Sequence, residues 1–338
     1  MFSKENIFGT VFACQVVTGV LGNSLILYFY MLNFLHGHRK KPIDFILTHL
    51  SLINVLLLVT KGIPRTVTLL GIRHFLGDIA CKTIVYLDRV FRSLSLCSTS
   101  ILSSYQAITL SSNSPVCAVL KAKASKHITA SFILCWMLSL LTEGAIPLYK
   151  ITLQNSSRFR NNWNLDYCIF SIYSMNTFNT MLLKILYDSV WFGLTTYSSI
   201  YIIFLMQKHH KKVLHIRSTN FSPKTCPEIK ATNTVVILVN SFICFHLVSS
   251  IFFALHKSQI SSSWMLHVSA FMSGCFPTFC PIVLMSSMSR FSTTCFFFQL
   301  QNKTSIFKDC IVVKEFARFS LLGLIPILKI LIIRTKPL

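Results

Sequence analysis

The chain has 338 residues, of which 53% are hydrophobic and only 12% are charged. A soluble domain carries about 25% charged residues, so this composition excludes an ordinary soluble protein and indicates a polytopic helical membrane protein. The formal net charge is +22, but the lysines and arginines gather in short loops between apolar segments. That pattern is a membrane-topology signal and argues against a nucleic-acid-binding protein.

Seven apolar segments are expected to cross the membrane as helices. The first is too long for the apolar core of a cleavable signal peptide, so it should remain as a span. Only Lys4 precedes it, whereas Arg39, Lys40 and Lys41 follow it, which predicts an extracellular N-terminus and a cytoplasmic C-terminus. The expected fold is an all-α seven-transmembrane helix bundle, with spans at 8–35, 43–70, 81–110, 127–147, 181–206, 229–255 and 264–285.

Ionisable residues within these spans are the first candidates for a site. Asp88, Arg89 and Arg92 lie in the third span, where an exposed charge costs about 2.5–3.5 kcal/mol, so we expect them to face protein or water. Asp88 and Arg92 are four residues apart and share a helix face. The candidate ligand-binding residues of the whole chain are Asp88, Arg89, Arg92, Glu143, Lys184, Asp188 and His246.

Structural roles are the alternative for each candidate. Asp88 and Arg92 can neutralise each other along one helix, as can Lys184 and Asp188, and a histidine such as His246 is more often a packing residue. If Asp88 does read ligand charge, Asp88→Asn should abolish responses to cationic ligands selectively. Structural or switching roles are expected at Asn23, Asn54, Gln106, Trp136, Pro277 and Pro281.

The segment 148–180 is expected to be the longest extracellular loop. It contains an N-glycosylation acceptor at Asn155, followed by Ser156 and Ser157, and it contains Cys168. Among the twelve cysteines, the topology places only Cys81, the first residue of the third span, and Cys168 at the outer surface, so they are the natural disulfide pair.

Several segments together resemble the vomeronasal type-1 receptors, a family of rhodopsin-like G-protein-coupled receptors. Tyr105-Gln106-Ala107-Ile108-Thr109 ends the third span, and Phe276-Pro277-Thr278-Phe279-Cys280-Pro281 lies in the seventh. The similar segments are LTHLSLINVLLLVTKGIP (47–64), residues 77–112, KASKHI (123–128), PEIKATNTVVILV (227–239) and SGCFPTFCPIVLMSS (273–287). The resemblance covers roughly residues 5–300.

The departures from general rhodopsin-like receptors have physical consequences. The acid-Arg-aromatic triplet that ends the third span in those receptors is replaced by Tyr105-Gln106-Ala107, so an inner lock can use only neutral hydrogen bonds, which are about half as strong as charge-assisted ones. Asn54 stands where the second span usually has an aspartate, so a sodium site there loses its carboxylate.

The resemblance implies a pheromone or related small semiochemical as ligand and a heterotrimeric Gi/o-type G protein as partner. It also implies a multi-pass plasma-membrane protein embedded in lipid, with no cofactor, metal or nucleic acid. A bitter-taste-type receptor is the nearest alternative, and a polytopic transporter is a more distant one, because no internal repeat is present. No catalytic constellation indicates an enzyme.

The end of the chain lies beyond the resemblance. We expect residues 1–300 to form the receptor domain and 301–338 to form a cytoplasmic tail of uncertain origin. Its apolar segment 319–333 is too short for a comfortable span, and it is interrupted by Pro326 and Lys329.

Overall fold

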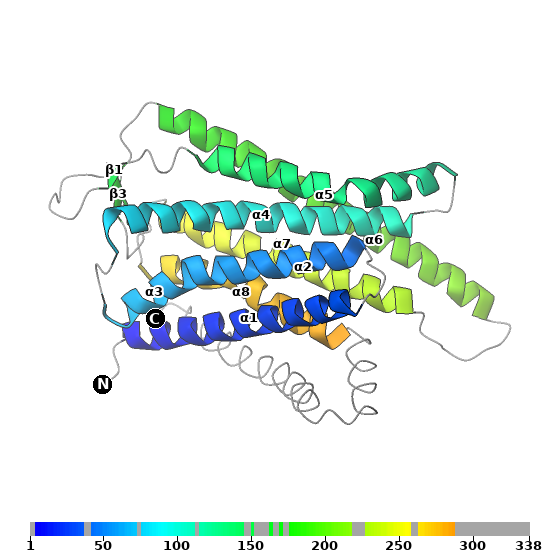
Figure 1. The fold of residues 1–338 in the computed structure, drawn as a ribbon, viewed down its shortest axis with the longest axis horizontal. Coiled ribbons are helices and arrows are strands. Elements are labelled where there is room, and N and C mark those ends of the chain that lie inside the picture. The colour runs from blue at the N-terminus through cyan, green and yellow to red at the C-terminus, as the bar shows by residue number, and fades with distance from the viewer. Residues whose placement is uncertain are drawn as a thin grey trace, which may run out of the picture.

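A computed structural model describes residues 4–36, 42–72, 76–111, 115–144, 150–151, 162–164, 169–171, 176–217, 227–257 and 263–287. Within them, long helices lie side by side as a bundle (Figure 1). The helices are α1 (Lys4–Leu35), α2 (Pro42–Leu57), the π-helical turn η1 (Leu58–Gly62), α3 (Ile63–Leu69), α4 (Asp78–Leu110), α5 (Pro115–Glu143), α6 (Asn176–Arg217), α7 (Pro227–Lys257) and α8 (Ser263–Ser287).

Six helical segments are long and apolar enough to cross a membrane, with α2, η1 and α3 counted as one continuous rod. Their outward surfaces carry large apolar side chains, including Leu141 at 72% exposure and Val190 at 68%. Such surfaces are stable against lipid and would be costly in water. The chain is therefore a multi-pass membrane protein, as its composition indicates.

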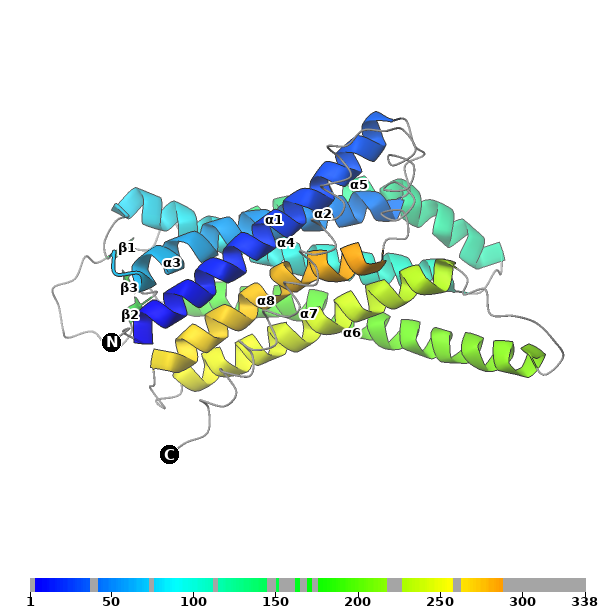
Figure 2. The ribbon, with the colours of Figure 1, turned by 90° about the horizontal axis from the view of Figure 1, so that it is seen from below.

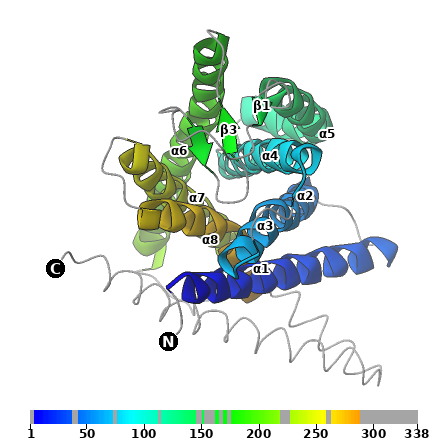
Figure 3. The same cartoon turned by 90° about the vertical axis from the view of Figure 1, so that its left-hand side faces the viewer.

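The helix α4 is the seventh rod and differs from the other six in polarity. It is 33 residues long and contacts α2, α5, α6 and α7, so it occupies the middle of the bundle (Figure 3). Serine and threonine side chains along it are buried, with Ser98, Thr99 and Ser100 each fully inaccessible. A helix enclosed by other helices need not be apolar, because its polar groups meet protein rather than lipid.

The turn η1 interrupts the second rod between α2 and α3. Gly62 and Gly19 allow α1 to lie close against it, because a Cβ atom on Gly62 would collide with the Val16 side chain and one on Gly19 would collide with Leu58. Pro64 follows directly, at the start of α3, where its missing N–H costs little. The second rod thus passes from α2 to α3 through one π-helical turn.

Three short strands lie between α5 and α6 in the chain: β1 (Lys150–Ile151), β2 (Asn162–Asn164) and β3 (Ile169–Ser171). They pair antiparallel in the order β1-β3-β2, with Ile151 opposite Phe170 and Trp163 opposite the same residue. This small sheet lies at the same end of the bundle as the N-terminus (Figure 2). It is a minor addition to an all-helical fold.

Candidate ligand-binding site

A cavity of about 350 Å³ lies between the helices, toward the end of the bundle that contains Cys81. We call this the Cys81 end and the opposite one the Gln106 end. Residues from η1 and α3 to α8 line the cavity, and six of them are the charged candidates that the sequence singles out. These six are Asp88, Arg89, Arg92, Glu143, Lys184 and Asp188. Four helices, α4, α5, α6 and the rod of α2 and α3, contribute its charged side chains.

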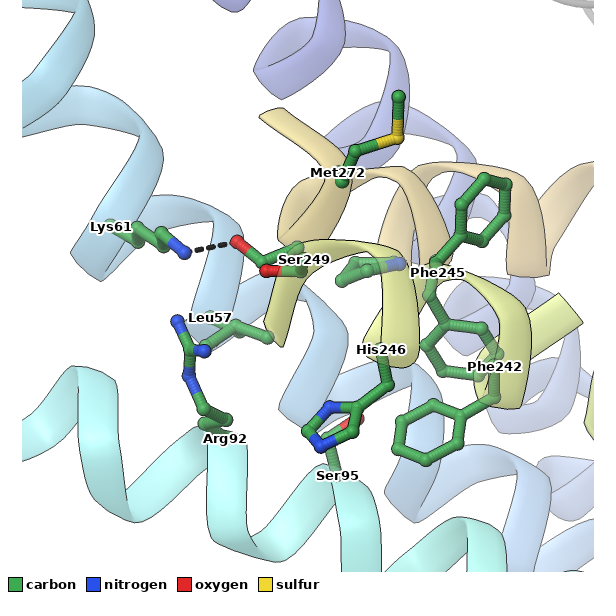
Figure 4. A pocket seen from close by; sticks show the side chains of 12 residues that line it. Leu57, Lys61, Arg92, Ser95, Phe242, Phe245, His246, Ser249 and Met272 are labelled. Carbon is green, nitrogen blue, oxygen red and sulfur yellow. Dashed lines mark hydrogen bonds between the residues drawn. The ribbon is translucent and has the colours of Figure 1, made fainter. Parts of the chain in front are cut away.

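A smaller recess of about 40 Å³ adjoins the cavity and shares Lys61, Arg92 and Ser249 with it. Its remaining walls are mainly apolar and aromatic, with Phe242 and Phe276 among them (Figure 4). The seventh candidate, His246, lines this recess and not the cavity. Its ring stacks on Phe242 with centroids 5.7 Å apart and contacts Phe192 at 5.5 Å. His246 is therefore an aromatic packing residue that also borders the recess.

Two carboxylates of the cavity share one lysine. Lys184 Nζ lies 2.5 Å from Glu143 Oε1 and 3.0 Å from Asp188 Oδ1, so the expected pair four residues apart on α6 is present and α5 adds a second acid. The Glu143 side chain is only 3% exposed, and Lys184 also lies 5.6 Å from the ring of Tyr187. This acidic triad carries a net charge of −1 and ties α5 to α6.

The alternative considered for Asp88 and Arg92, mutual neutralisation along one helix, is not seen as an ion pair. Among the residues that the structure describes, neither Asp88 nor Arg92 takes part in an ion pair within 4.0 Å. Arg92 instead extends away from α4 toward Leu57 and Lys61 (Figure 4). Asp88 is 7% exposed, and its Oδ1 atom has no hydrogen-bond partner in the described part of the chain. Spacing along a helix brings two side chains within reach but does not fix the direction in which a long one extends.

The charged lining is unevenly distributed. The cavity is lined by five cationic and three acidic side chains, an excess of two positive charges. Two of the acids belong to the triad, whereas Lys61, Arg65, Arg89 and Arg92 stand together on the side formed by η1, α3 and α4. Arg65 donates to His267 Nδ1 at 2.9 Å and lies over the Phe12 ring.

Lys61 and Arg65 are site residues that the sequence analysis did not select. Both are ionisable residues within or beside an apolar span, which is the same signal that identified Asp88. Their position late in the second span, next to Gly62 and Pro64, gave no indication that they face the cavity.

Polar side chains between the cavity and the Gln106 end join neighbouring spans through hydrogen bonds. Pro281 lacks an N–H group, so the carbonyl of Pro277 has no helical donor, and Asn23 Nδ2 supplies one at 2.8 Å while also donating to Gly19 O at 2.7 Å. Asn54 Nδ2 lies 3.4 Å from Asn23 Oδ1. Asn23 therefore faces the bundle and compensates for a proline of the seventh span.

Trp136 is also a packing residue with a polar contact. Its indole Nε1 donates to His49 Nε2 at 3.0 Å, and His49 Nδ1 lies 3.0 Å from Ser98 Oγ. The ring also packs edge-on against Phe91 at 6.4 Å. These contacts join α2, α4 and α5 in the middle of the bundle.

At the Gln106 end, a neutral hydrogen bond joins the third and sixth spans. Gln106 Nε2 donates to Thr232 Oγ1 at 2.9 Å, and both side chains are buried. The sequence lacks the arginine and the carboxylate that usually pair at this position, so a neutral hydrogen bond is the contact that remains possible.

Cys81 is disulfide-bonded. Its expected partner Cys168 lies outside the described residues, as do the glycosylation acceptor Asn155 and the tail 301–338.

The arrangement of the helices is that of a rhodopsin-like receptor. The structure is similar to that of squid rhodopsin, with a TM-score of 0.64 over 93% of this chain and 91% of that protein, at 13% sequence identity. The likeness establishes the fold, which is a seven-helix bundle of the rhodopsin type.

The family follows from the sequence comparisons. Residues 6–297 match the vomeronasal organ pheromone receptor family. The chain is 35% identical to human vomeronasal type-1 receptor 4 over 83% of this chain and 94% of that protein, and 33% identical to mouse vomeronasal type-1 receptor 45 over 85% and 90%. The chain belongs to the vomeronasal type-1 receptor family. It is thus a multi-pass plasma-membrane receptor of the G-protein-coupled type and not an enzyme, and the bitter-taste and transporter alternatives no longer apply.

Proposed function

We propose that this receptor detects a pheromone or related small semiochemical in the cavity at the Cys81 end and signals through a Gi/o-type G protein at the Gln106 end. The observation that carries the proposal is the convergence of six charged side chains from α4, α5 and α6 on one cavity. Charges that are costly to place in lipid are concentrated where a ligand could use them.

The cavity suits a small molecule. Its volume lies at the lower part of the range of about 300–1,000 Å³ that small-molecule sites occupy. The adjoining aromatic recess offers an apolar surface for the body of such a ligand. Seven predicted ligand contacts line one or the other space, and we propose that they contact the ligand directly.

The orientation completes the proposal. The positive-inside rule puts the N-terminus outside, so the Cys81 end faces the extracellular medium and the Gln106 end faces the cytoplasm. The disulfide at Cys81 suits the oxidising side, and we propose Cys168 as its partner.

Nucleotide exchange tests the function. Membranes containing the receptor and one purified heterotrimer at a time, of Gi, Go, Gs or Gq type, are exposed to a panel of volatile and steroid-like odorants. We expect at least one odorant to stimulate exchange on Gi or Go, and pertussis toxin to abolish it. Stimulation confined to Gs or Gq would contradict the coupling, and odorant flux without exchange would contradict the receptor function.

A further inference from the structure

Lys61 occupies the junction between the cavity and the recess. Among the described residues, Lys61, Arg92 and Ser249 are the three that line both the cavity and the recess. A ligand that extends from the polar cavity into the aromatic recess has to pass these three side chains.

The π-helical turn brings Lys61 to this position. Leu57, Lys61 and Arg65 all line these spaces, and they follow one another at intervals of four residues. On a regular α-helix, each such interval rotates the side chain by about 40° beyond a full turn, so three successive residues would drift off a common line. A π-helical turn holds more residues per turn and offsets the drift. The close approach of Gly62 to Val16 and of Gly19 to Leu58 packs this turn tightly against α1.

The donors of Lys61 are largely unused. A lysine ammonium carries three N–H donors, and Ser273 Oγ on α8 is the hydrogen-bond partner that the described residues provide. Arg92 has neither a hydrogen bond nor an ion pair with any described residue. Lys61 and Arg92 thus face the same junction, and Lys61 contacts the neutral hydroxyl of Ser273.

The carboxylates of the cavity form no ion pair with these two cations in the described part of the chain. Glu143 and Asp188 are engaged with Lys184, and Asp88 lies beyond ion-pair distance of both Lys61 and Arg92. A charge removed from bulk water is costly unless an opposite charge or hydrogen-bonding groups compensate it. An anionic oxygen is the kind of group that would compensate both charges at this junction.

We propose that Lys61 is a specificity-determining residue that binds an anionic oxygen group of the ligand, a carboxylate or an acid ester, and exchanges Ser273 for it. Arg92 provides the second cationic contact, the apolar body of the ligand lies in the larger cavity, and only a small apolar group reaches the 40 Å³ recess beside Phe242 and Phe276. Asp88 then shares a cavity in which cationic side chains outnumber acidic ones, which disfavours a cationic ligand. The proposal rests on the proposed function, because it names the ligand class of the same cavity.

Cysteine labelling tests the position and its charge without any signalling. In Lys61→Cys, the thiol is reacted with 2-sulfonatoethyl and 2-(trimethylammonio)ethyl methanethiosulfonate, and each rate is divided by that reagent's rate with a free thiol. We expect the anionic reagent to react about tenfold faster, the lower end of electrostatic enhancement in a charged cleft. The control Val59→Cys is two residues away and 38% exposed on the outer surface, and it should react with neither reagent; the unsubstituted chain gives the background.

Two probes with one skeleton test the ligand class. Nucleotide exchange is measured with 2-naphthylacetic acid and with 2-(2-naphthyl)ethanol at matched surface expression. Lys61→Met should raise the half-maximal concentration of the acid by about 10- to 100-fold, as for a lost hydrogen bond to a charged group. The alcohol should change by less than about threefold, within the value of one neutral hydrogen bond. Ser273→Ala keeps the ammonium and should preserve the preference for the acid.

The outcomes separate the ligand class from the function. Equal losses for both probes in Lys61→Met, or faster labelling by the cationic reagent, would overturn the proposal. A receptor whose Lys61→Cys thiol prefers the anionic reagent, but which stimulates exchange with no compound, would retain the anionic site and contradict the proposed signalling function.

Discussion

Removal of the Gln106 side-chain amide should raise the activity of the receptor in the absence of ligand. Gln106 on α4 donates to Thr232 on α7 at 2.9 Å, and both residues are buried, at 7% and 2% exposure. Outward movement of the sixth span at the Gln106 end would break this bond. The bond therefore favours the closed arrangement of the two helices.

The size of the effect follows from the chemistry of the contact. A neutral hydrogen bond contributes about 0.5–1.5 kcal/mol net, which corresponds to about a 2- to 12-fold change in the ratio of open to closed receptors. An arginine–carboxylate lock would contribute about twice as much. This receptor should consequently have a weaker lock than a receptor with the charged pair.

The assay is ligand-free nucleotide exchange on a purified Gi heterotrimer, normalised to the amount of receptor at the surface. Gln106→Ala and Thr232→Val should each raise the basal rate, and the double variant should raise it no further than the larger of the two, because both changes remove the same bond. Unchanged basal rates in both single variants, or fully additive effects in the double variant, would refute the reasoning.

Three further predictions concern the stability and orientation of the bundle. Asn23→Asp should lower the melting temperature more than Asn23→Ala. Both variants lose the donor to Pro277 O, but Asp also places a buried carboxylate against the carbonyl oxygens of Gly19 and Pro277; equal melting temperatures would contradict this. Lys184→Met should lower the free energy of unfolding by about 3 kcal/mol, which is the lower end for breaking a buried ion pair, because Asp188 is one-third exposed. Glu143→Gln leaves the pair of Lys184 and Asp188 intact and should lower the free energy of unfolding by less. An epitope before Lys4 should be stained on intact cells, and one at the C-terminus only after permeabilisation; the reverse would invert the orientation.

Much of the site could be predicted because lipid restricts where charges can lie. Ionisable residues in apolar spans must face protein or water, and this argument alone selected Asp88, Arg89 and Arg92 before any cavity was known. The structure places all three on the cavity wall. The same argument extends to Glu143 and Lys184, whose separate spans meet there.

The contacts between spans could not be predicted in the same way. Spacing along one helix indicates which residues share a face, but it does not reveal which neighbouring helix lies opposite or how a long side chain bends. Asp88 and Arg92 have the spacing of an ion pair and do not form one, whereas Glu143 finds its cation on another helix. The π-helical turn that aims Lys61 at the cavity depends on close packing with α1, which no local pattern reveals.

The most direct test of the central claim, that the ligand acts from within the cavity, is stimulated nucleotide exchange by a receptor whose cavity is filled. Ser250 lines the cavity on α7, and Leu247 on the same helix is 45% exposed on the outer surface, so Ser250→Trp and Leu247→Trp form a matched pair. With 2-naphthylacetic acid as the probe, Ser250→Trp should abolish stimulated exchange and retain the basal rate, while Leu247→Trp should respond as the unsubstituted receptor does. Stimulation of Ser250→Trp at an unchanged concentration of the acid would contradict the account.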